Sequence, residues 1–260
     1  MKRFVFILIA FLPLLSCVRE CGKEIVVMTY NVGVFGKYTE NSTGMVADII
    51  DAAGADVVAL NELDSCNRRH NTYQVRDLAD SLGGWSYSFA KALQFKVGSY
   101  GNGVVSRLPI LKSAQVLLPL SDGAEVRSMA VVETEDYVLA STHFDHVGTM
   151  ARVEQARFIT DWFKKHYSRT SKPVFLCGDM NSRPDDPALV ELLESWTMLS
   201  GTEFTCPNID PYVCIDYIFC LKSDRNSVEV LDYVVPTVET MPDVAVASDH
   251  LPVYVRLKVS

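Results

Sequence analysis

The sequence is poor in positive charge and has no Cys-x-x-Cys pair. Among 260 residues, 24 are lysine or arginine and 32 are aspartate or glutamate, which gives a formal net charge of −8. A protein that holds nucleic acid non-specifically through its phosphates usually carries a basic face. The charge therefore argues against a stable nucleic-acid partner, although it leaves room for a local basic groove. The seven cysteines include no Cys-x-x-Cys pair, which argues against a structural zinc site.

The start of the chain lacks an apolar run long enough to span a bilayer. Residues 4–15 are apolar but short and contain Pro13, and they follow a basic start, as in an export signal. Leu14-Leu15-Ser16-Cys17 resembles the lipobox of a bacterial lipoprotein. That resemblance implies a signal peptide over residues 1–16, lipidation of Cys17, a tether over residues 17–22 and a membrane-anchored protein on the periplasmic or cell-surface side. An ordinary secretory signal, in which Cys17 is incidental, is the alternative.

No Gly/Ser linker, repeat or low-complexity run divides the rest of the chain, and 48% of all residues are apolar, as in a globular protein. We therefore expect one domain over residues 23–260, acting as a monomer. Because an exported protein can form disulfides, Cys206 and Cys214, which flank a turn-rich loop, are the best candidate pair. Cys177 lies within an apolar run and is expected to pack as a small apolar residue.

Strands and helices alternate along this domain. Their succession predicts an α/β sandwich. A hairpin is expected where two β-branched and aromatic runs flank Glu135-Asp136. The expected strands are residues 25–30, 56–60, 85–90, 103–106, 128–134, 137–142, 174–177, 215–220, 227–235 and 252–259. The expected helices are residues 45–53, 73–82, 188–194 and a long helix from about residue 149 whose apolar face includes residues 153–163.

Polar side chains that can titrate or bind a metal stand at the ends of these strands. The apolar run 174–177 gives way to Asp179 and Asn181, whose side chains point to the same side of an extended chain. Each of these residues alone could be an ordinary turn or surface residue. Together they supply oxygen ligands for a hard cation, a base for water and donors for phosphoryl oxygens, which hydrolysis at phosphorus requires. The set comprises Asn31, Glu62, His143, Asp179, Asn181, Asp216, Asp249 and His250.

Six motifs occur in the order and spacing of the endonuclease/exonuclease/phosphatase superfamily. They are TYNVG, LNELD, STHFDH, GDMNSRP, IDYIF and SDHLPV, and the segment YGNGVVSRLPI is similar as well. The resemblance covers residues 24–258. It implies a DNase I-like, four-layer α/β sandwich, in which two mixed β-sheets pack face to face between helices, with the site at one end of the sheets.

The resemblance also implies a role for each motif residue. Mg²⁺ or Mn²⁺ is the implied cofactor. The implied metal-binding residues are Glu62, Asn31 and Asp249; the implied catalytic residues are His250, Asp179, His143, Asp216 and Asn181, of which His143 and Asn181 also bind the phosphate.

General chemistry supports the implied pairing of His250 with Asp216. A neutral imidazole is a competent base near pH 7. An acid on its other nitrogen selects the tautomer and stabilises the imidazolium. Whether Asp179 or His250 takes the proton from water stays open at this point.

Five further polar residues each allow two interpretations. Asp145 and His146 could contact the substrate or cap the long helix that follows. Arg127 and Arg152 could meet phosphate or form structural ion pairs. Asn102, within a Gly-Asn-Gly turn, is expected to support the backbone rather than bind a ligand.

The sequence leaves the substrate open, because members of this superfamily act on lipids, nucleic acids and soluble phosphates. His143 in the third motif resembles the sphingomyelinase, phosphatase and tyrosyl-DNA phosphodiesterase branches. We expect an exported, divalent-metal-dependent hydrolase of phosphate esters. An extracellular DNase-like nuclease is the alternative. A catalytically inactive, lipid-anchored binding protein is a third possibility, against which the complete set of eight site residues argues.

Overall fold

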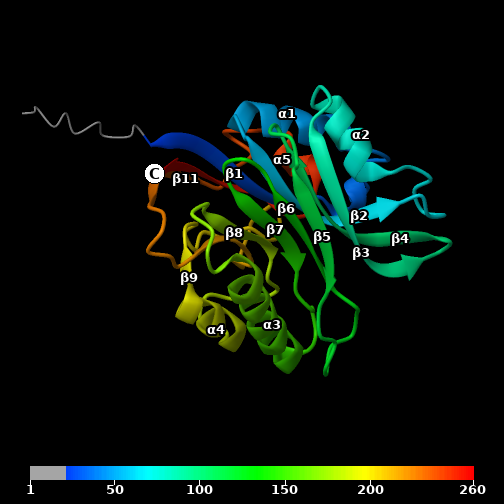
Figure 1. Cartoon of the computed structure of the whole chain (residues 1–260). Coiled ribbons are helices and arrows are strands. Elements are labelled where there is room, and N and C mark those ends of the chain that lie inside the picture. The colour runs from blue at the N-terminus through cyan, green and yellow to red at the C-terminus, as the bar shows by residue number, and fades with distance from the viewer. Residues whose placement is uncertain (1–21) are drawn as a thin grey trace, which may run out of the picture.

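A computed structural model of the chain describes residues 22–260. They form two six-stranded β-sheets that pack face to face, with helices on the outer sides (Figure 1). This is the four-layer α/β sandwich predicted from the sequence. The predicted signal peptide (residues 1–16), the lipidation site Cys17 and the tether up to residue 21 lie outside the described residues. Within residues 22–260, no helix combines the length and the apolar character needed to cross a membrane.

The first sheet contains both the first and the last strand of the domain. β1 (Lys23–Asn31) is parallel to β2 (Val57–Ser65) and antiparallel to β12 (Val253–Val259). Because β1 and β2 are parallel, their carboxyl ends meet at one edge, where Asn31 lies opposite Asn61. The order is β11-β12-β1-β2-β4-β3, completed by β11 (Val228–Val234), β4 (Gly98–Ser106) and β3 (Ser86–Phe95).

The second sheet brings three predicted site residues into register. β7 (Val138–His143) and β8 (Val174–Asp179) are parallel, so His143 lies opposite Asp179. β10 (Asp216–Leu221) runs antiparallel to β8, which places Asp216 opposite Asp179. The order is β5-β6-β7-β8-β10-β9, with β5 (Lys112–Leu117), β6 (Ser128–Glu133) and β9 (Trp196–Met198). The predicted hairpin is confirmed, since β6 and β7 pair antiparallel.

The helices divide between the two outer faces of the sandwich. α3 (Thr149–Tyr167) and α4 (Pro187–Ser195) lie together below the second sheet in Figure 1, and α1 and α2 lie at the opposite side. The apolar face predicted for the long helix is the face that α3 buries. The helices of the other side are α1 (Thr43–Ala53), α2 (Gln74–Ser81), the short α5 (Val244–Ala247) and the 3-10 turn η1 (Gly33–Phe35).

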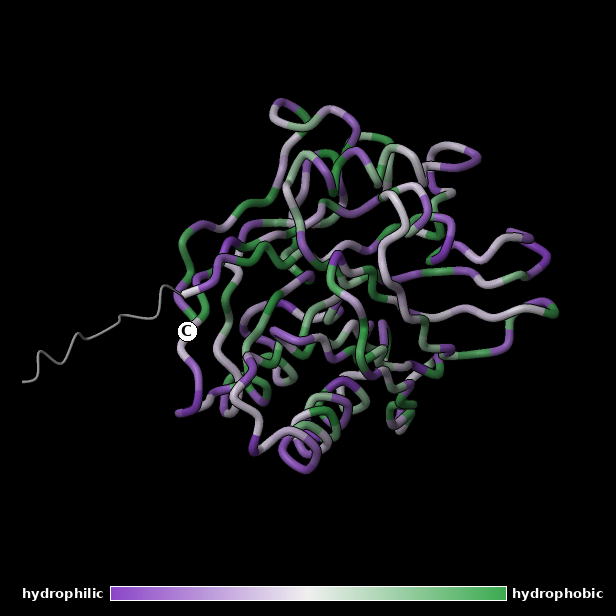
Figure 2. The backbone as a smooth tube through the Cα atoms, turned by 45° about the horizontal axis from the view of Figure 1, so that its top comes forward, coloured by the Kyte–Doolittle hydropathy of each residue, from purple (hydrophilic) through white to green (hydrophobic). Residues whose placement is uncertain are grey.

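Three clusters of buried side chains correspond to the three interfaces between layers. One lies between the first sheet and its helices, one between the second sheet and its helices, and one between the two sheets. Every residue of β7 and β8 is buried, as expected for strands covered on both faces. In the helices of Figure 2, hydrophobic and hydrophilic residues follow one another within each turn, because only one face of a helix such as α3 meets a sheet.

The sequence analysis did not predict β5, β9 or α5. β5 has the sequence KSAQVL, and every residue of this edge strand is at least partly exposed. β9 has three residues and α5 has four. Such short or polar segments carry little local signal, so their structure depends on the neighbours with which they pair.

The predicted disulfide between Cys206 and Cys214 is wrong, since both thiols are free. Cys206 pairs with Val213 across an antiparallel bridge. The next residue, Cys214, therefore points to the opposite side of the chain, where it joins the core beneath α3 and α4. Cys177 packs in the core between the sheets, as predicted.

Candidate active site

Asp179, at the carboxyl end of β8, is the centre of a cluster of polar side chains. Its carboxylate atom Oδ2 accepts a hydrogen bond from Nδ2 of Asn31 at 3.1 Å and lies 3.4 Å from Nε2 of His143. Nε2 of His250 lies 3.8 Å from the same oxygen. These partners come from β1, β7 and the loop before β12, so residues from both sheets converge on one carboxylate.

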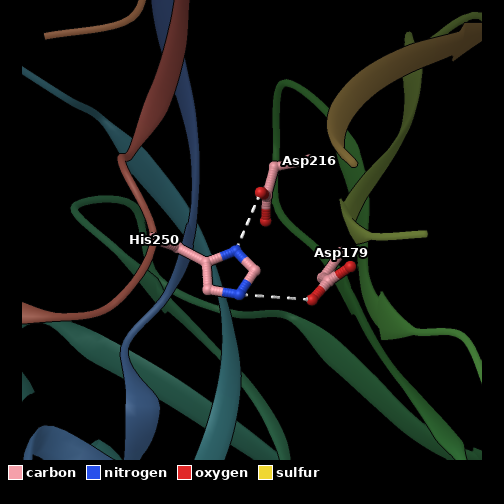
Figure 3. A group of neighbouring side chains, drawn as sticks. All are labelled: Asp179, Asp216 and His250. Atoms are coloured by element: carbon pink, nitrogen blue, oxygen red, sulfur yellow. Dashed lines mark hydrogen bonds and ion pairs between the residues drawn. The ribbon is translucent and has the colours of Figure 1, made fainter. Parts of the chain in front are cut away.

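His250 is held between two carboxylates, as Figure 3 shows. Its Nδ1 lies 2.9 Å from Oδ2 of Asp216, while its Nε2 is directed toward Asp179. Asp216 is itself held by Thr205, whose hydroxyl donates to Oδ2 at 2.6 Å. Because a carboxylate only accepts, Nδ1 of His250 carries a proton and Nε2 is the nitrogen available to take another.

The electrostatics of this relay favour the transfer of protons. Burial alone would lower the pKa of His250, but the adjacent carboxylate of Asp216 raises that pKa well above its ordinary value. Burial raises the pKa of Asp179, and the charge of nearby Asp216 raises it further. Such perturbed, mutually facing groups are typical of catalytic acids and bases.

Glu62 and Asp249 form an oxygen-lined position for a cation beside Asp179. The ammonium group of Lys37 lies 2.8 Å from Oδ2 of Asp249 and 3.6 Å from Oε2 of Glu62. Nδ2 of Asn31 donates to the other carboxylate oxygen of Glu62 at 3.4 Å. Both carboxylates thus face one positive charge, and carboxylate oxygens are the ligands that Mg²⁺ and Mn²⁺ prefer. These residues fit the predicted metal ion.

A second set of possible metal ligands consists of Asp179, Asp216 and His250. One ligand atom from each lies within 4.8 Å of the others. Nδ1 of His250 and Oδ2 of Asp216 bind each other, and Thr205 donates to the same oxygen, whereas Oδ1 of Asp216 is buried and has no hydrogen-bond partner among the described residues. Both this set and the pair of Glu62 and Asp249 could therefore hold a cation.

The backbone at Glu62 directs its side chain into the site. The pairing of β2 with β4 shifts register between Leu60 and Leu63, as in a β-bulge. Glu62 lies in this irregularity with a φ of 57°, a left-handed conformation that non-glycine residues seldom adopt. A bulge re-aims a side chain relative to its strand. The local strain is therefore associated with the placement of the implied metal ligand.

A model of the Endonuclease/Exonuclease/phosphatase family matches residues 28–250 of the chain. The chain belongs to this family. No curated protein matches it.

Solved structures of several proteins share the family fold with this chain. A Bacteroides vulgatus endonuclease/exonuclease/phosphatase is 21% identical, with a TM-score of 0.73 over 92% of this chain and 100% of that one. The Bacteroides thetaiotaomicron mannosyl-6-phosphatase Bt3783 is 19% identical, with a TM-score of 0.71 over 90% and 99%. The catalytic domain of human nocturnin is 18% identical, with a TM-score of 0.68 over 91% and 94%. At these identities the likeness demonstrates a common fold.

His143 and Asn181, the two residues implied to bind phosphate, make different contacts in this structure. His143 is buried, and burial, followed by the charge of Arg127, lowers its pKa well below the ordinary value. It is therefore a neutral side chain facing Asp179. Asn181 donates its side-chain amide to the carbonyl of Phe144 at 3.0 Å, while its backbone N–H donates to Asp179 at 2.9 Å. The second amide hydrogen of Asn181 is the one that remains for a phosphoryl oxygen.

For five polar residues the sequence analysis left open a ligand contact or a structural role. Three of them have structural contacts in this protein. The carboxylate of Asp145 accepts hydrogen bonds from four backbone N–H groups, those of residues 124, 125, 147 and 148. Arg152 donates to the carbonyl of Asp145 and to Thr149. Asn102 is buried and donates to the carbonyl of Ser128, as expected for a residue that supports the backbone. Arg127 and His146 contact each other beside His143.

The sequence analysis missed three residues that build the site. Asn61 accepts from the backbone N–H of Asp179 at 2.9 Å and donates to the carbonyl of Thr142 at 2.8 Å, which ties the two sheets together at the site. An asparagine at the end of the apolar run VVAL was the available signal for it. Thr205 and Lys37 lie in loops without a distinctive pattern, and only the fold brings them to Asp216 and Glu62.

Proposed function

We propose that this protein is an exported, divalent-metal-dependent hydrolase of phosphate esters. The observation that carries the proposal is the relay of Asp216, His250 and Asp179 beside the oxygen-lined cation position of Glu62 and Asp249. A base for water next to a site for a hard cation is the combination that hydrolysis at phosphorus requires. The family supports hydrolysis of phosphate esters, and the named neighbours include a phosphatase.

The residues of the site have separate tasks in this reaction. The water that attacks phosphorus gives its proton to the relay formed by Asp179 and His250, and Asp216 keeps His250 in the required tautomer. His143 and Asn181 donate to phosphoryl oxygens, whose charge increases in the transition state. Asn31 holds Asp179 and Glu62 in place through one amide group.

The metal and the location of the protein complete the proposal. Mg²⁺ or Mn²⁺, bound by Glu62 and Asp249 with Asn31 beside them, would polarise a phosphoryl oxygen and offset its negative charge. The resemblance of Leu14-Leu15-Ser16-Cys17 to a lipobox supports export and anchoring to a membrane through Cys17. Phosphate esters outside the cytoplasm are therefore the proposed substrates.

Hydrolysis of two small esters tests the reaction. Residues 23–260 are purified and assayed on p-nitrophenyl phosphate and bis-p-nitrophenyl phosphate with Mg²⁺, Mn²⁺ or EDTA. We expect metal-dependent turnover that falls by about 10²- to 10⁴-fold in His250→Ala. His166→Ala is the control, because His166 is exposed on α3 and bonds only to the carbonyl of Trp162. Turnover that survives His250→Ala or EDTA would contradict the mechanism.

Two further assays address the alternatives and the anchor. Plasmid DNA is incubated with the same protein, since cleavage faster than that of both small esters would favour a nuclease. In the full-length chain, Cys17→Ser is expected to move the protein from the membrane fraction to the soluble fraction. An unchanged distribution would refute the lipid anchor.

A further inference from the structure

Arg127 and His146 form a hydrogen-bonded pair next to the proposed phosphate site. Arg127 immediately precedes β6, and His146 follows the last residue of β7, His143, by three positions. β6 and β7 are neighbours in the second sheet. The terminal guanidinium nitrogen Nη2 of Arg127 lies 3.2 Å from Nδ1 of His146. The mechanism derived above uses neither residue.

Arg127 is almost completely buried and forms an ion pair. It is 4% exposed, and its other terminal nitrogen lies 3.1 Å from a carboxylate oxygen of Glu125. Asp145 binds the backbone of residues 124 and 125, which restrains the loop that carries this ion pair. Nε of Arg127 is buried and has no hydrogen-bond partner among residues 22–260. A buried charged group with an unused donor calls for a functional explanation.

The contact with Arg127 determines the tautomer of His146. A guanidinium group has donors and no acceptor, so Nδ1 of His146 must accept and cannot carry the proton. The proton of the neutral ring is then on Nε2. His146 is exposed, so Nε2–H is a donor that the molecule orients and leaves accessible.

Arg127 lies beside His143, a residue of the implied phosphate site. Arg127 immediately precedes β6, which pairs with β7, the strand that ends at His143. After burial, the charge of Arg127 is the largest cause of the lowered pKa of His143. A positive group in this place favours a ligand with additional negative charge.

We propose that Arg127 and His146 bind the additional negative oxygen of a phosphate monoester, so that the enzyme prefers monoesters to diesters. The inference rests on the proposed function and extends it to the substrate class. A monoester presents three non-bridging oxygens and carries nearly two negative charges at pH 7. The cation position, His143 and Asn181 account for two of these oxygens. Nε2–H of His146 contacts the third, and Arg127 is the residue that positions His146.

Comparison of the two esters tests this assignment. His146→Ala is expected to lower kcat/KM for p-nitrophenyl phosphate by about tenfold or more, as for a lost hydrogen bond to a charged group. The same variant should change kcat/KM for bis-p-nitrophenyl phosphate by less than about twofold. His146→Gln restores a side-chain N–H donor and should recover part of the monoester activity. His166→Ala should match the unsubstituted enzyme on both esters.

Several results would overturn the inference. A preference for the diester in the unsubstituted enzyme is one, and equal losses on both esters in His146→Ala is another. Equal losses would assign His146 a general structural role. If the unsubstituted enzyme hydrolysed neither ester, the proposed function itself would fail, and the binding measurement below would then decide the inference separately.

Nuclear magnetic resonance of ¹⁵N-labelled histidine provides a test that does not depend on turnover. We expect His146 to carry its proton on Nε2, whereas His166, whose Nδ1 donates to the carbonyl of Trp162, provides the opposite tautomer in the same sample. Inorganic phosphate should shift the Nε2 signal of His146 and leave His166 unchanged. Arg127→Met should remove the tautomer preference of His146. A proton on Nδ1 of His146, or no response to phosphate, would refute the assignment.

Discussion

Asp179 accepts contacts from residues that lie up to 148 positions away in the chain. At the scale of single residues, the site depends on the hydrogen bonds that fix the orientation of each catalytic side chain. Oδ2 of Asp216 binds both the hydroxyl of Thr205 and Nδ1 of His250, which leaves His250 with one reactive nitrogen. That nitrogen faces Asp179 because the loop before β12 is anchored by Ser248, whose hydroxyl donates to the carbonyl of Asn31 at 2.6 Å.

Asp216→Asn should show that Asp216 orients His250 and does not bind the substrate. An amide at this position removes the charge that stabilises the imidazolium and no longer enforces a proton on Nδ1. We expect kcat on the preferred ester to fall by about 10²- to 10⁴-fold with a small change in KM. Asp224→Asn, an exposed aspartate beyond the other end of β10, is the control. An equal loss in both variants would show that the carboxylate near His250 has no special role.

At the scale of elements, the hydrogen bonds of one carboxylate and the close approach of two strands hold the strand ends in place. The carboxylate of Asp145 joins the loop at residues 124–125 to the segment that leads into α3. The backbones of β7 and β8 approach closely at Gly178, which has a φ of 146°. A Cβ at this glycine would lie 1.8 Å from the carbonyl oxygen of Thr142. Both devices act on segments that carry site residues.

Asp145→Asn should destabilise the fold in a pH-dependent way. Burial alone would raise the pKa of Asp145, but its backbone hydrogen bonds lower that pKa from 3.8 to about 2. The carboxylate therefore stabilises the folded state fully above about pH 4, and this contribution is lost as the pH falls toward 2. At pH 7 we expect a loss of about 2 kcal/mol in the free energy of unfolding. Urea titrations from pH 7 to pH 2.5 should show the gap between the two proteins narrowing, and a constant gap would contradict the assignment.

Gly178→Ala should damage the second sheet severely. The new methyl group would collide with backbone, which cannot move without separating β7 from β8. We expect a loss of more than about 4 kcal/mol, detected as a lower thermal midpoint or as insoluble protein. Gly44→Ala is the matched control, since a Cβ there meets nothing within 4 Å and its helix should gain up to about 1 kcal/mol. Similar behaviour of the two variants would refute the close approach at Gly178.

At the scale of the whole molecule, the active site exists only where the two sheets meet. Asn31 and Glu62 belong to the first sheet, whereas His143, Asp179 and Asp216 belong to the second. The core between the sheets therefore supports the geometry of the site as well as the fold. Loss of this packing should remove activity and tertiary structure together.

Leu257→Ala tests the coupling between the sheets and the site. Leu257 on β12 is fully buried in the core between the sheets, and its truncation should cost about 2–5 kcal/mol. Leu117→Ala, on the edge strand β5 at 60% exposure, should change stability by no more than about 0.5 kcal/mol. In Leu257→Ala, activity and near-ultraviolet circular dichroism should disappear at the same urea concentration. Activity that outlasts the tertiary signal would show that the site survives separation of the sheets.

The sequence by itself determined the fold class and most of the strands and helices, and it named the eight residues of the candidate site. It could do so because strand periodicity and short motifs are local, and because the motif TYNVG and its partners place polar groups at strand ends. The face of α3 and the hairpin of β6 and β7 followed from the same local patterns.

Only the tertiary structure decided which of these groups touch. It placed Lys37 between Glu62 and Asp249, and Asn61 against Asp179, because both contacts connect segments that no local pattern relates. It also refuted the disulfide, since the direction of Cys214 depends on the bridge between Cys206 and Val213. Sequence spacing limits which residues can meet, but side-chain direction depends on register, and register is settled by pairing across the sheets.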